Sequence, residues 1–301
     1  MKEEKNDSES ERFNFARDCL KAILLRLAPR AGDFSTPIPG VGIARRETAG
    51  FSEHRFERPL VSVLVNSLKK TFMGGGEYTM RAGQVLTVCA DMPSSSKILE
   101  ASPENPLLTF YFSLNQRIIK ESLVEIKLPV SEEWRGGGVS VASADTDFME
   151  AILRLATIIE KPDQIPARAE LALRDLHLLL LLGPQGRVIR NFFGPGSFNN
   201  EIFAAIEYLR SNIDRVVCAK ELARIANMSE STLYRYFKSL TGISPLQYHK
   251  KLRLHEGRRL ILENNERASI AAYKTGYESV SQFSREYKKL FGKSPRQSRK
   301  E

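Results

Sequence analysis

Residues 229–245 and 279–295 are two versions of one segment, and this internal repeat constrains the fold more than any other feature of the chain. The copies, SESTLYRYFKSLTGISP and SVSQFSREYKKLFGKSP, align without a gap and are identical at eight positions. Each copy is therefore expected to fold into the same local structure and to expose the same kind of surface. A repeated surface indicates a repeated target.

Each copy has the pattern of one amphipathic helix with its own start and stop signals. A serine suited to N-capping begins the copy, three apolar residues recur on one face, and a glycine follows where a C-cap needs a positive φ. In the second copy, Gln282 is also placed to complete a capping box. The residues in these roles are Ser229, Leu233, Phe237, Leu240 and Gly242 in the first copy, and Ser279, Phe283, Tyr287, Leu290 and Gly292 in the second.

A short helix-like stretch and a tight turn precede each copy, CAKELARIANMS and ASIAAYKTGYES. Small residues there, such as Ala223 and Gly276, allow two helices to cross closely, as a helix-turn-helix requires when its second helix enters a DNA major groove. Between the copies, residues 246–265 contain no proline and predict one long connecting helix. A helix of about 20 residues spans roughly 30 Å, close to the ~34 Å of one DNA turn.

The positive charge of the chain is concentrated in its last third. Residues 201–301 hold 20 Lys and Arg against 11 Asp and Glu, whereas residues 1–200 hold 25 against 25, so the whole net charge of +9 lies in the last third. Phosphate binding by counterion release needs such a localised excess. A basic face alone also suits an acidic protein or a membrane surface. The localised charge and the repeat together favour DNA binding. The alternative is a pair of helices that makes only protein contacts.

Residues 206–296 resemble the double helix-turn-helix of AraC/XylS-type transcription regulators. The resemblance rests on A-x-x-A-N-M-S-x-S-x-L-x-R-x-F-K at 223–238, TG-x-SP-x-Q-Y at 241–248 and GYES-x-SQFSREYK-x-LFG-x-SP at 276–295. It implies two units, at about 218–242 and 269–292, whose second helices enter successive major-groove segments. By position it implies DNA contacts from Ser231, Thr232, Tyr234, Arg235 and Lys238 in the first unit, and from Val280, Ser281, Gln282, Ser284, Arg285, Lys288 and Lys289 in the second, with the lysines suited to phosphates.

Arg235 and Arg285 are the predicted base readers. A guanidinium group can donate two parallel hydrogen bonds to guanine, a contact worth about 1–3 kcal/mol of discrimination. The alternative for each arginine is an ion pair with a neighbouring acid, Glu230 or Glu286. For Tyr234, contact with DNA and packing on the helix surface are both consistent with the sequence.

The first 114 residues change from a polar start to β-strand patterns. Residues 1–11 are acidic and polar and predict a disordered segment, and residues 15–28 predict a helix that ends before Pro29. Short runs rich in β-formers then alternate with glycine turns, which predicts an all-β barrel or sandwich whose interior suits a small molecule. The runs, between Val41 and Leu114, are VGIARRE, LVSVLVN, KKTFM, EYTMR, QVLTVCAD, SKILEA and LLTFYFSL.

This half resembles the cupin-type N-terminal domain of one branch of AraC-type regulators, which implies a regulatory domain for effector binding or dimerisation. The likeness is carried by RLAPRAGDFSTPIPGV at 26–41, Y-x-x-x-x-G-x-x-L at 78–86, ADMP at 90–93 and LEASPENPLL at 99–108. The expected class is α+β multidomain, with a cupin-like β-barrel, a helical layer and an all-α double helix-turn-helix. The expected domains are a disordered start and leading helix (1–25), the barrel (26–142), a helical dimerisation and linker region (143–198) and the DNA-binding domain (199–301).

The sequence offers no catalytic or metal centre, so neither an enzyme nor a cofactor is predicted. A metal-binding cupin needs two or three histidines with a carboxylate on neighbouring strands, and only His54 lies in the barrel region. No nucleophile elbow, phosphate-binding loop or dinucleotide fingerprint occurs. Cys89, in the run QVLTVCAD, is the one candidate residue for an effector pocket; its alternative is a small buried hydrophobe.

Residues 145–193 predict helices with more leucine than one modest core needs. Leu171, Leu178 and Leu182 are therefore expected to join two subunits or the two domains, with burial inside one chain as the alternative. The Gly- and Pro-rich residues 183–200 predict a domain boundary. The longest leucine run is too short to span a membrane, and no signal peptide is evident, so a cytoplasmic location is expected.

Together these patterns predict a sequence-specific DNA-binding transcription regulator of the AraC family. Promoter DNA, a small-molecule effector and a second copy of the chain are the expected partners, with RNA polymerase as a further partner if the protein is an activator rather than a repressor. Two rival hypotheses come from other classes: an architectural DNA-binding protein without sequence preference, and a cupin enzyme that carries a DNA-binding tail.

Overall fold

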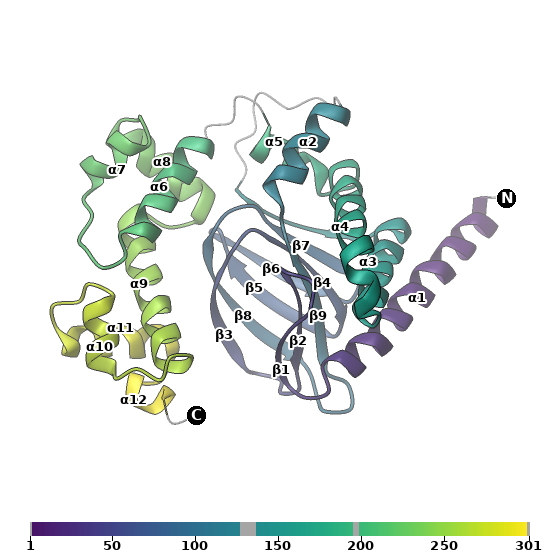
Figure 1. Cartoon of the computed structure of the whole chain (residues 1–301), viewed down its shortest axis with the longest axis horizontal. Helices are drawn as coiled ribbons and strands as arrows, with labels where there is room; N and C mark the ends of the chain where they lie inside the picture. The colour runs from purple at the N-terminus through teal and green to yellow at the C-terminus, as the bar shows by residue number, and fades with distance from the viewer. Residues whose placement is uncertain (1, 127–136, 195–198, 300–301) are drawn as a thin grey trace.

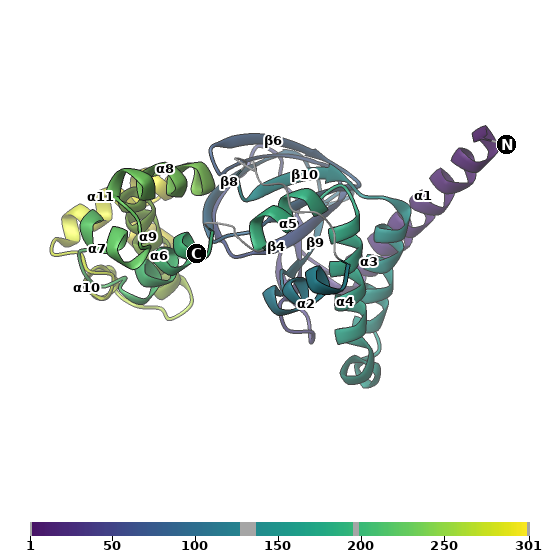
Figure 2. The ribbon, with the colours of Figure 1, turned by 90° about the horizontal axis from the view of Figure 1, so that it is seen from above.

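The computed structural model describes residues 2–126, 137–194 and 199–299. They form a sheet-rich N-terminal part and an all-helical C-terminal part, so the class is α+β, as predicted. The helical part lies on one side of the sheets, and the long first helix extends away on the opposite side (Figures 1 and 2).

Two antiparallel sheets enclose the interior of the N-terminal part. Within the described residues, one sheet has six strands in the order β1-β2-β9-β4-β7-β10 and the other has four in the order β3-β8-β5-β6. The strands are β1 (Gly32–Ser35), β2 (Val41–Arg46), β3 (Ser52–Glu57), β4 (Leu60–Asn66), β5 (Leu68–Met73), β6 (Gly76–Arg81), β7 (Gln84–Val88), β8 (Met92–Glu100), β9 (Leu107–Ser113) and β10 (Val139–Ser143).

Helices cover the outer face of the six-stranded sheet. They are α1 (Lys2–Leu27), α2 (Gln116–Ile126), α3 (Thr146–Ile159), the short 3-10 helix η1 (Pro162–Gln164), α4 (Ile165–Leu182) and α5 (Gly186–Phe193). Successive residues of a strand point to opposite faces. In β4, Val61 and Val63 are accordingly fully buried, while Leu60 and Ser62 line the interior.

The seven predicted β runs are confirmed as β2 and β4–β9. Four further elements were not predicted from the sequence: β1, β3, β10 and α2. The missed strand β3 has the sequence SEHRFE, whose charges resemble those of a surface loop. It is an edge strand that pairs with β8, and its charged residues alternate with ring-bearing ones.

The predicted disorder of residues 1–11 is wrong, because α1 begins at Lys2. The helix continues from the polar start into the apolar run that packs on α3. Arg12 forms an ion pair with Glu150 of α3 (3.0 Å), and Arg26 forms one with Glu160 just beyond that helix (2.8 Å). Packing of its second half explains how the helix can extend through a segment of low hydrophobicity, since helix growth from an existing nucleus is cooperative.

The expected boundary at residues 183–200 is only partly a connection. Residues 186–193 form α5, whose apolar side chains Val188, Ile189, Phe192 and Phe193 are buried. A segment rich in glycine and proline thus contains one amphipathic helix whose apolar face packs into the core. Residues 195–198, where the rest of the prediction falls, lie outside the described residues.

The C-terminal part consists of seven helices in the described residues: α6 (Asn199–Ser211), α7 (Ala219–Ile225), α8 (Glu230–Thr241), α9 (Pro245–Leu262), α10 (Ala268–Lys274), α11 (Val280–Phe291) and α12 (Pro295–Ser298). The pairs α7–α8 and α10–α11 are the two repeated helix-turn-helix units, and α9 connects them (Figure 1). At about 1.5 Å per residue, the 18 residues of α9 span roughly 27 Å.

Candidate DNA interface and ligand cavity

The repeated helices α8 and α11 begin and end as their sequences predict. Ser229 and Ser279 accept hydrogen bonds from the backbone N–H groups of Thr232 and Gln282, respectively. Gly242 and Gly292 both cap the C-terminus with φ of 77°. The second capping-box bond expected from Gln282 is not formed; its side chain instead donates to Glu286 (3.4 Å).

The residues predicted to contact DNA lie on the outward faces of α8 and α11. Eight are exposed: Ser231, Arg235, Lys238, Ser281, Gln282, Arg285, Lys288 and Lys289. Four are half-buried: Thr232, Tyr234, Val280 and Ser284. The half-buried position of Tyr234 suits both of its predicted roles. Both helices therefore present a polar and basic surface from the same register of the repeat.

The acidic partners considered for the two arginines are arranged differently. Glu286 pairs with Lys250 of α9 (2.7 Å) and accepts from the Tyr277 hydroxyl (2.9 Å). Among the described residues, no ion pair joins Arg235 to Glu230 or Arg285 to Glu286. The Arg235 guanidinium lies over the ring of Tyr236 at 5.1 Å, which leaves its donors free to bond outward.

The two units differ in how they are anchored. The first unit shares the hydrophobic core of the barrel, through Phe237 and Leu240 of α8 and through Tyr248 of the adjoining α9. The second unit has a core of its own, formed by Leu254, Leu260, Ile261, Ala271, Ala272, Tyr277, Phe283 and Tyr287. The first unit is thus packed into the N-terminal part, whereas the second is attached mainly through α9.

Polar contacts add to the docking of the first unit. The Tyr248 hydroxyl donates to the backbone carbonyl of Asp91 (3.0 Å), and Arg210 of α6 forms an ion pair with the Asp91 carboxylate (3.1 Å). The C-terminal end of α8 meets the turn between β5 and β6. A Cβ atom on Gly242 would lie 2.6 Å from the carbonyl carbon of Gly74, so only glycine fits at this contact.

The barrel encloses a cavity of about 250 Å³ between its two sheets. Its lining combines apolar residues with hydroxyl and charged groups, as small-molecule sites commonly do. The lining residues are Ala44, Arg46, Glu53, Arg55, Glu57, Leu60, Ser62, Lys69, Thr71, Met73, Leu86, Ser96, Ile98, Leu107, Thr109 and Tyr111.

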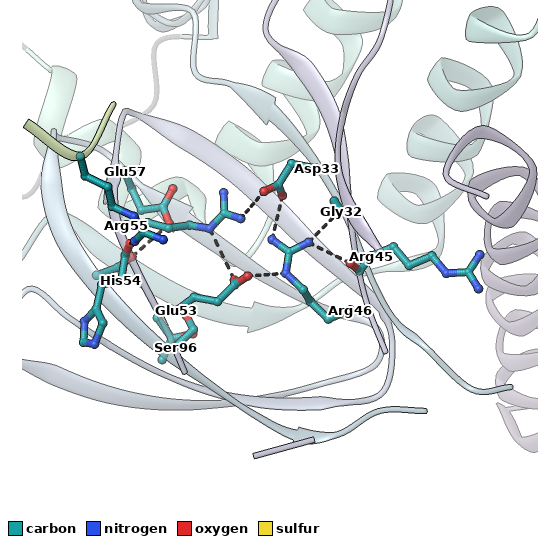
Figure 3. A network of polar contacts seen from close by, with 12 residues as sticks. Gly32, Asp33, Arg45, Arg46, Glu53, His54, Arg55, Glu57 and Ser96 are labelled. Carbon is teal, nitrogen blue, oxygen red and sulfur yellow. Dashed lines mark hydrogen bonds and ion pairs between the residues drawn. The ribbon is translucent and has the colours of Figure 1, made fainter. Parts of the chain in front are cut away.

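A network of ion pairs crosses one side of the cavity (Figure 3). Asp33 of β1 binds Arg46 (2.9 Å) and Arg55 (2.6 Å), while Glu53 binds Arg46 and also lies 3.5 Å from Arg55. Burial alone would raise the pKa of Asp33, but the two arginines outweigh it and the pKa is lowered. The Asp33 carboxylate therefore stays ionised, and these ion pairs join β1, β2 and β3 through their side chains.

Lys69 is the cavity cation without such a partner. Its ammonium forms no hydrogen bond or ion pair within the described part of the chain. Burial lowers the pKa of Lys69, although Glu57 and Glu53 oppose this shift. Thr109, which is 4% exposed, also lines the cavity, and its hydroxyl has no hydrogen-bond partner. These two groups are available to a ligand.

Cys89 does not belong to this cavity. It follows β7, is fully buried, and is not among the lining residues. Burial raises the pKa of its thiol well above the usual range, which disfavours the reactive thiolate. The geometry fits the alternative, a small buried hydrophobe. Sequence reasoning missed most of the cavity's charged groups, because Glu53, Arg55 and Glu57 lie on the unpredicted strand β3.

The interface between the barrel and α9 contains a histidine that should make stability depend on pH. Burial, followed by Arg258, His54 and Lys251, lowers the pKa of His255 to about 3. Since an unfolded histidine titrates near 6.5, the unfolded chain binds more protons between these values. The stabilisation is present above pH 6.5 and is lost as the pH falls toward 3.

We therefore expect the free energy of unfolding to fall by on the order of 1 kcal/mol from this one group between pH 7.5 and pH 5.5. The comparison is denaturant unfolding of the wild type and of His255→Gln at both pH values. The variant should show a smaller acid loss. An equal loss in the two proteins would contradict the prediction.

Comparison with known proteins identifies the two parts. Residues 37–188 match the family described as AraC-type transcriptional regulator N-terminus, and residues 222–301 match a helix-turn-helix domain family. The HTH-type transcriptional activator RhaS of Enterobacter sp. (strain 638) is 24% identical over 266 residues, which cover 85% of this chain and 90% of RhaS. The HTH-type transcriptional regulator YobQ of Bacillus subtilis is 33% identical over 94 residues, 31% of this chain but only 39% of YobQ.

The fold also has relatives among solved structures. Apo ToxT from Vibrio cholerae, in a variant form, superposes with a TM-score of 0.62 at 12% identity, covering 89% of this chain and 98% of ToxT. Two matched helix-turn-helix units joined to a β-barrel with an internal cavity define a DNA-binding transcription regulator. The chain belongs to the AraC-type family of transcriptional regulators. Among the described residues, no helix is both long and apolar enough to cross a bilayer.

Proposed function

We propose that this protein reads a two-part promoter site, with α8 and α11 in successive major-groove segments on one face of the duplex. This proposal is supported by the finding that both repeats expose the same face. Arg235 and Arg285 lie at equivalent positions on it, and neither has an acidic partner in the described residues. The neighbouring lysines Lys238, Lys288 and Lys289 would bind phosphates. This proposal includes no catalytic step and no cofactor.

Selection from random duplexes with the full-length protein tests this proposal. A regulator should select a site with two contacted elements about one helical turn, ~34 Å, apart, and prefer it to scrambled DNA by at least roughly 10³ at fixed salt. Binding without a preferred sequence would favour the rival architectural protein, which grips phosphates alone.

The barrel cavity is the proposed effector site. Lys69 and the Thr109 hydroxyl offer unpaired donors, and Leu60, Met73 and Leu86 offer an apolar wall. A small molecule with an anionic, hydrogen-bond-accepting group and an apolar part fits this combination, because it would compensate a desolvated cation. ToxT, which shares the fold, has been solved with an unsaturated fatty acid bound; its 14% identity supports the fold alone.

Replacing Lys69 by methionine should weaken the binding of such a ligand. Hexanoate serves as the probe and hexanamide as its neutral counterpart. Hexanoate is expected to raise the Tm of the wild type and to bind Lys69→Met at least about fivefold more weakly, in line with the loss of about 1 kcal/mol or more when a charged hydrogen-bond partner is removed. Isothermal calorimetry gives the affinities.

Lys70→Met is the matched control, since Lys70 lies next along β5 and pairs with Glu77 (2.5 Å) outside the cavity lining. It should bind hexanoate like the wild type. Equal affinity for hexanoate and hexanamide, or an unchanged affinity in Lys69→Met, would exclude the proposed role of Lys69.

Subunit pairing, polymerase contact and location complete the proposal. Leu171 and Leu182 of α4 are 68% and 60% exposed, which suits a surface that joins two copies of the chain; Leu178 is half-buried. A homodimer would match a site with repeated elements.

If the protein activates transcription, RNA polymerase is a further partner. A cytoplasmic location, where promoter DNA is present, is part of the same proposal.

A further inference from the structure

The strand β3 has one face in the cavity and the other against the DNA-binding module. Glu53, Arg55 and Glu57 line the cavity. The alternate residues His54 and Phe56 lie on the opposite face, where their rings contact Phe291 of α11 and His255 of α9, as the period of a strand requires. Figure 3 shows the His54 side chain directed away from the ion pairs. One short strand therefore contacts both the proposed effector site and the helices that carry the DNA-reading surfaces.

The outward face of β3 holds α9 mainly through aromatic contacts. The Phe56 ring packs edge-on against Tyr248 and His255 of α9, with ring centroids 5.1 and 5.6 Å apart. His54 lies 6.4 Å from the ring of Phe291 at the end of α11. Arg258 donates to the His54 backbone carbonyl (3.3 Å) and covers the Phe291 ring. The connecting helix α9 thus contacts β3 through Tyr248 and His255, and the second unit contacts it through Phe291.

Ion pairs hold the inward-facing side chains of β3 in place. Arg55 binds Asp33 of β1, and Glu53 binds Arg46 of β2. Since β3 is an edge strand whose only ladder in the described residues is with β8, these side chains connect it to the six-stranded sheet across the cavity. A ligand that pairs with one of these groups competes with the contacts that hold β3.

We propose that β3 transmits the state of the cavity to the DNA-binding module, with Phe56 as the positioning residue. This inference rests on the proposed effector function of the cavity. While Arg55 is held by Asp33 and Glu53, Phe56 keeps α9 docked and the barrel fixes how the two units lie relative to each other. A ligand that draws Arg55 or Glu53 away releases α9, and the two recognition helices can then adjust to successive grooves.

A double-mutant cycle tests this coupling in the full-length protein, with affinity for the selected DNA site as the readout. Arg55→Met imitates loss of the cavity contacts and is expected to raise DNA affinity about fivefold or more, the lower range of allosteric coupling. Phe56→Ala should raise it similarly, because it releases α9 directly. Adding Arg55→Met to Phe56→Ala should then change nothing further.

Phe72→Ala is the matched control, because Phe72 is an exposed aromatic on the outer face of β5 in the same sheet. Arg55→Met should keep its full effect in that background. If the effects of Arg55→Met and Phe56→Ala add, or if Arg55→Met leaves DNA affinity unchanged or lowers it, the coupling is refuted. Glu53→Gln provides a second cavity variant should Arg55→Met fail to fold.

Hydrogen exchange of the α9 backbone separates this inference from the proposed function. If the wild type selects no DNA sequence, the proposed function fails, but the coupling still predicts faster exchange in α9 for Arg55→Met than for the wild type. In the Phe56→Ala background, Arg55→Met should cause no further increase. If Arg55→Met leaves the exchange rates in α9 unchanged, the coupling is refuted independently of DNA binding.

Discussion

Replacing Gly242 by alanine should destabilise the protein far more than the same change at Gly292, although the two glycines are equivalent in the repeat. Both have φ of 77°, so alanine costs about 1–2 kcal/mol at either position through left-handed strain. At Gly242 the added methyl also meets the backbone of Gly74 and Gly75, whereas at Gly292 no other part of the chain that the structure describes, beyond its immediate neighbours, comes within 4 Å of it. Overpacking against backbone adds about 1–3 kcal/mol.

Denaturant unfolding of the two variants beside the wild type measures this difference. Gly292→Ala serves as the control for backbone strain, so the excess loss at Gly242 reports the contact between α8 and the turn after β5. Equal losses would mean that this contact contributes nothing to the fold in solution.

Arg235→Ala and Arg285→Ala are expected to relax sequence preference, each at its own half of the selected site. Each should reduce discrimination by about 1–3 kcal/mol, the value of a bidentate contact to guanine. The measurement is affinity for the selected site and for sites altered in one half, at fixed salt. The effect should follow the repeat: Arg235 with one half, Arg285 with the other.

Lys238→Ala provides the contrast from the same helix. As a phosphate contact it should weaken binding to all sequences alike and reduce the salt slope by about 1. If the two arginine variants instead lose affinity uniformly across sequences, α8 and α11 grip the backbone and the architectural rival gains support.

The strands predicted from the sequence are runs rich in β-forming residues that turn residues separate. LVSVLVN matches β4 to the residue, because β-branched residues and leucine are typical of a buried strand. SEHRFE was missed because its inward residues are charged, and charges in a strand normally indicate a solvent-facing surface. Glu53 and Arg55 are half-buried here because Arg46 and Asp33, from other strands, compensate their charges.

The candidate sites divide in the same way. The exposed faces of α8 and α11 follow from the repeat, since the position of a residue on a capped amphipathic helix fixes whether it faces outward. The DNA contacts proposed for these faces come from the family resemblance. The effector pocket does not follow from a local pattern: the sequence suggested Cys89, which is buried away from the cavity, and overlooked Lys69 and Arg55. The lining of a barrel depends on which strands become neighbours, which local patterns do not encode.

The two helix-turn-helix units, their caps, their exposed faces and the basic charge of the last third are encoded locally, because each depends on residues that are close together in the chain. Long-range packing, by contrast, places the first unit in the core of the barrel and gives the second a core of its own. It also places β3 between the cavity and α9. These features arise from contacts between residues far apart in the chain, such as Phe56 with Tyr248 and His255, whose pairing is set by packing and by the compensation of buried charge.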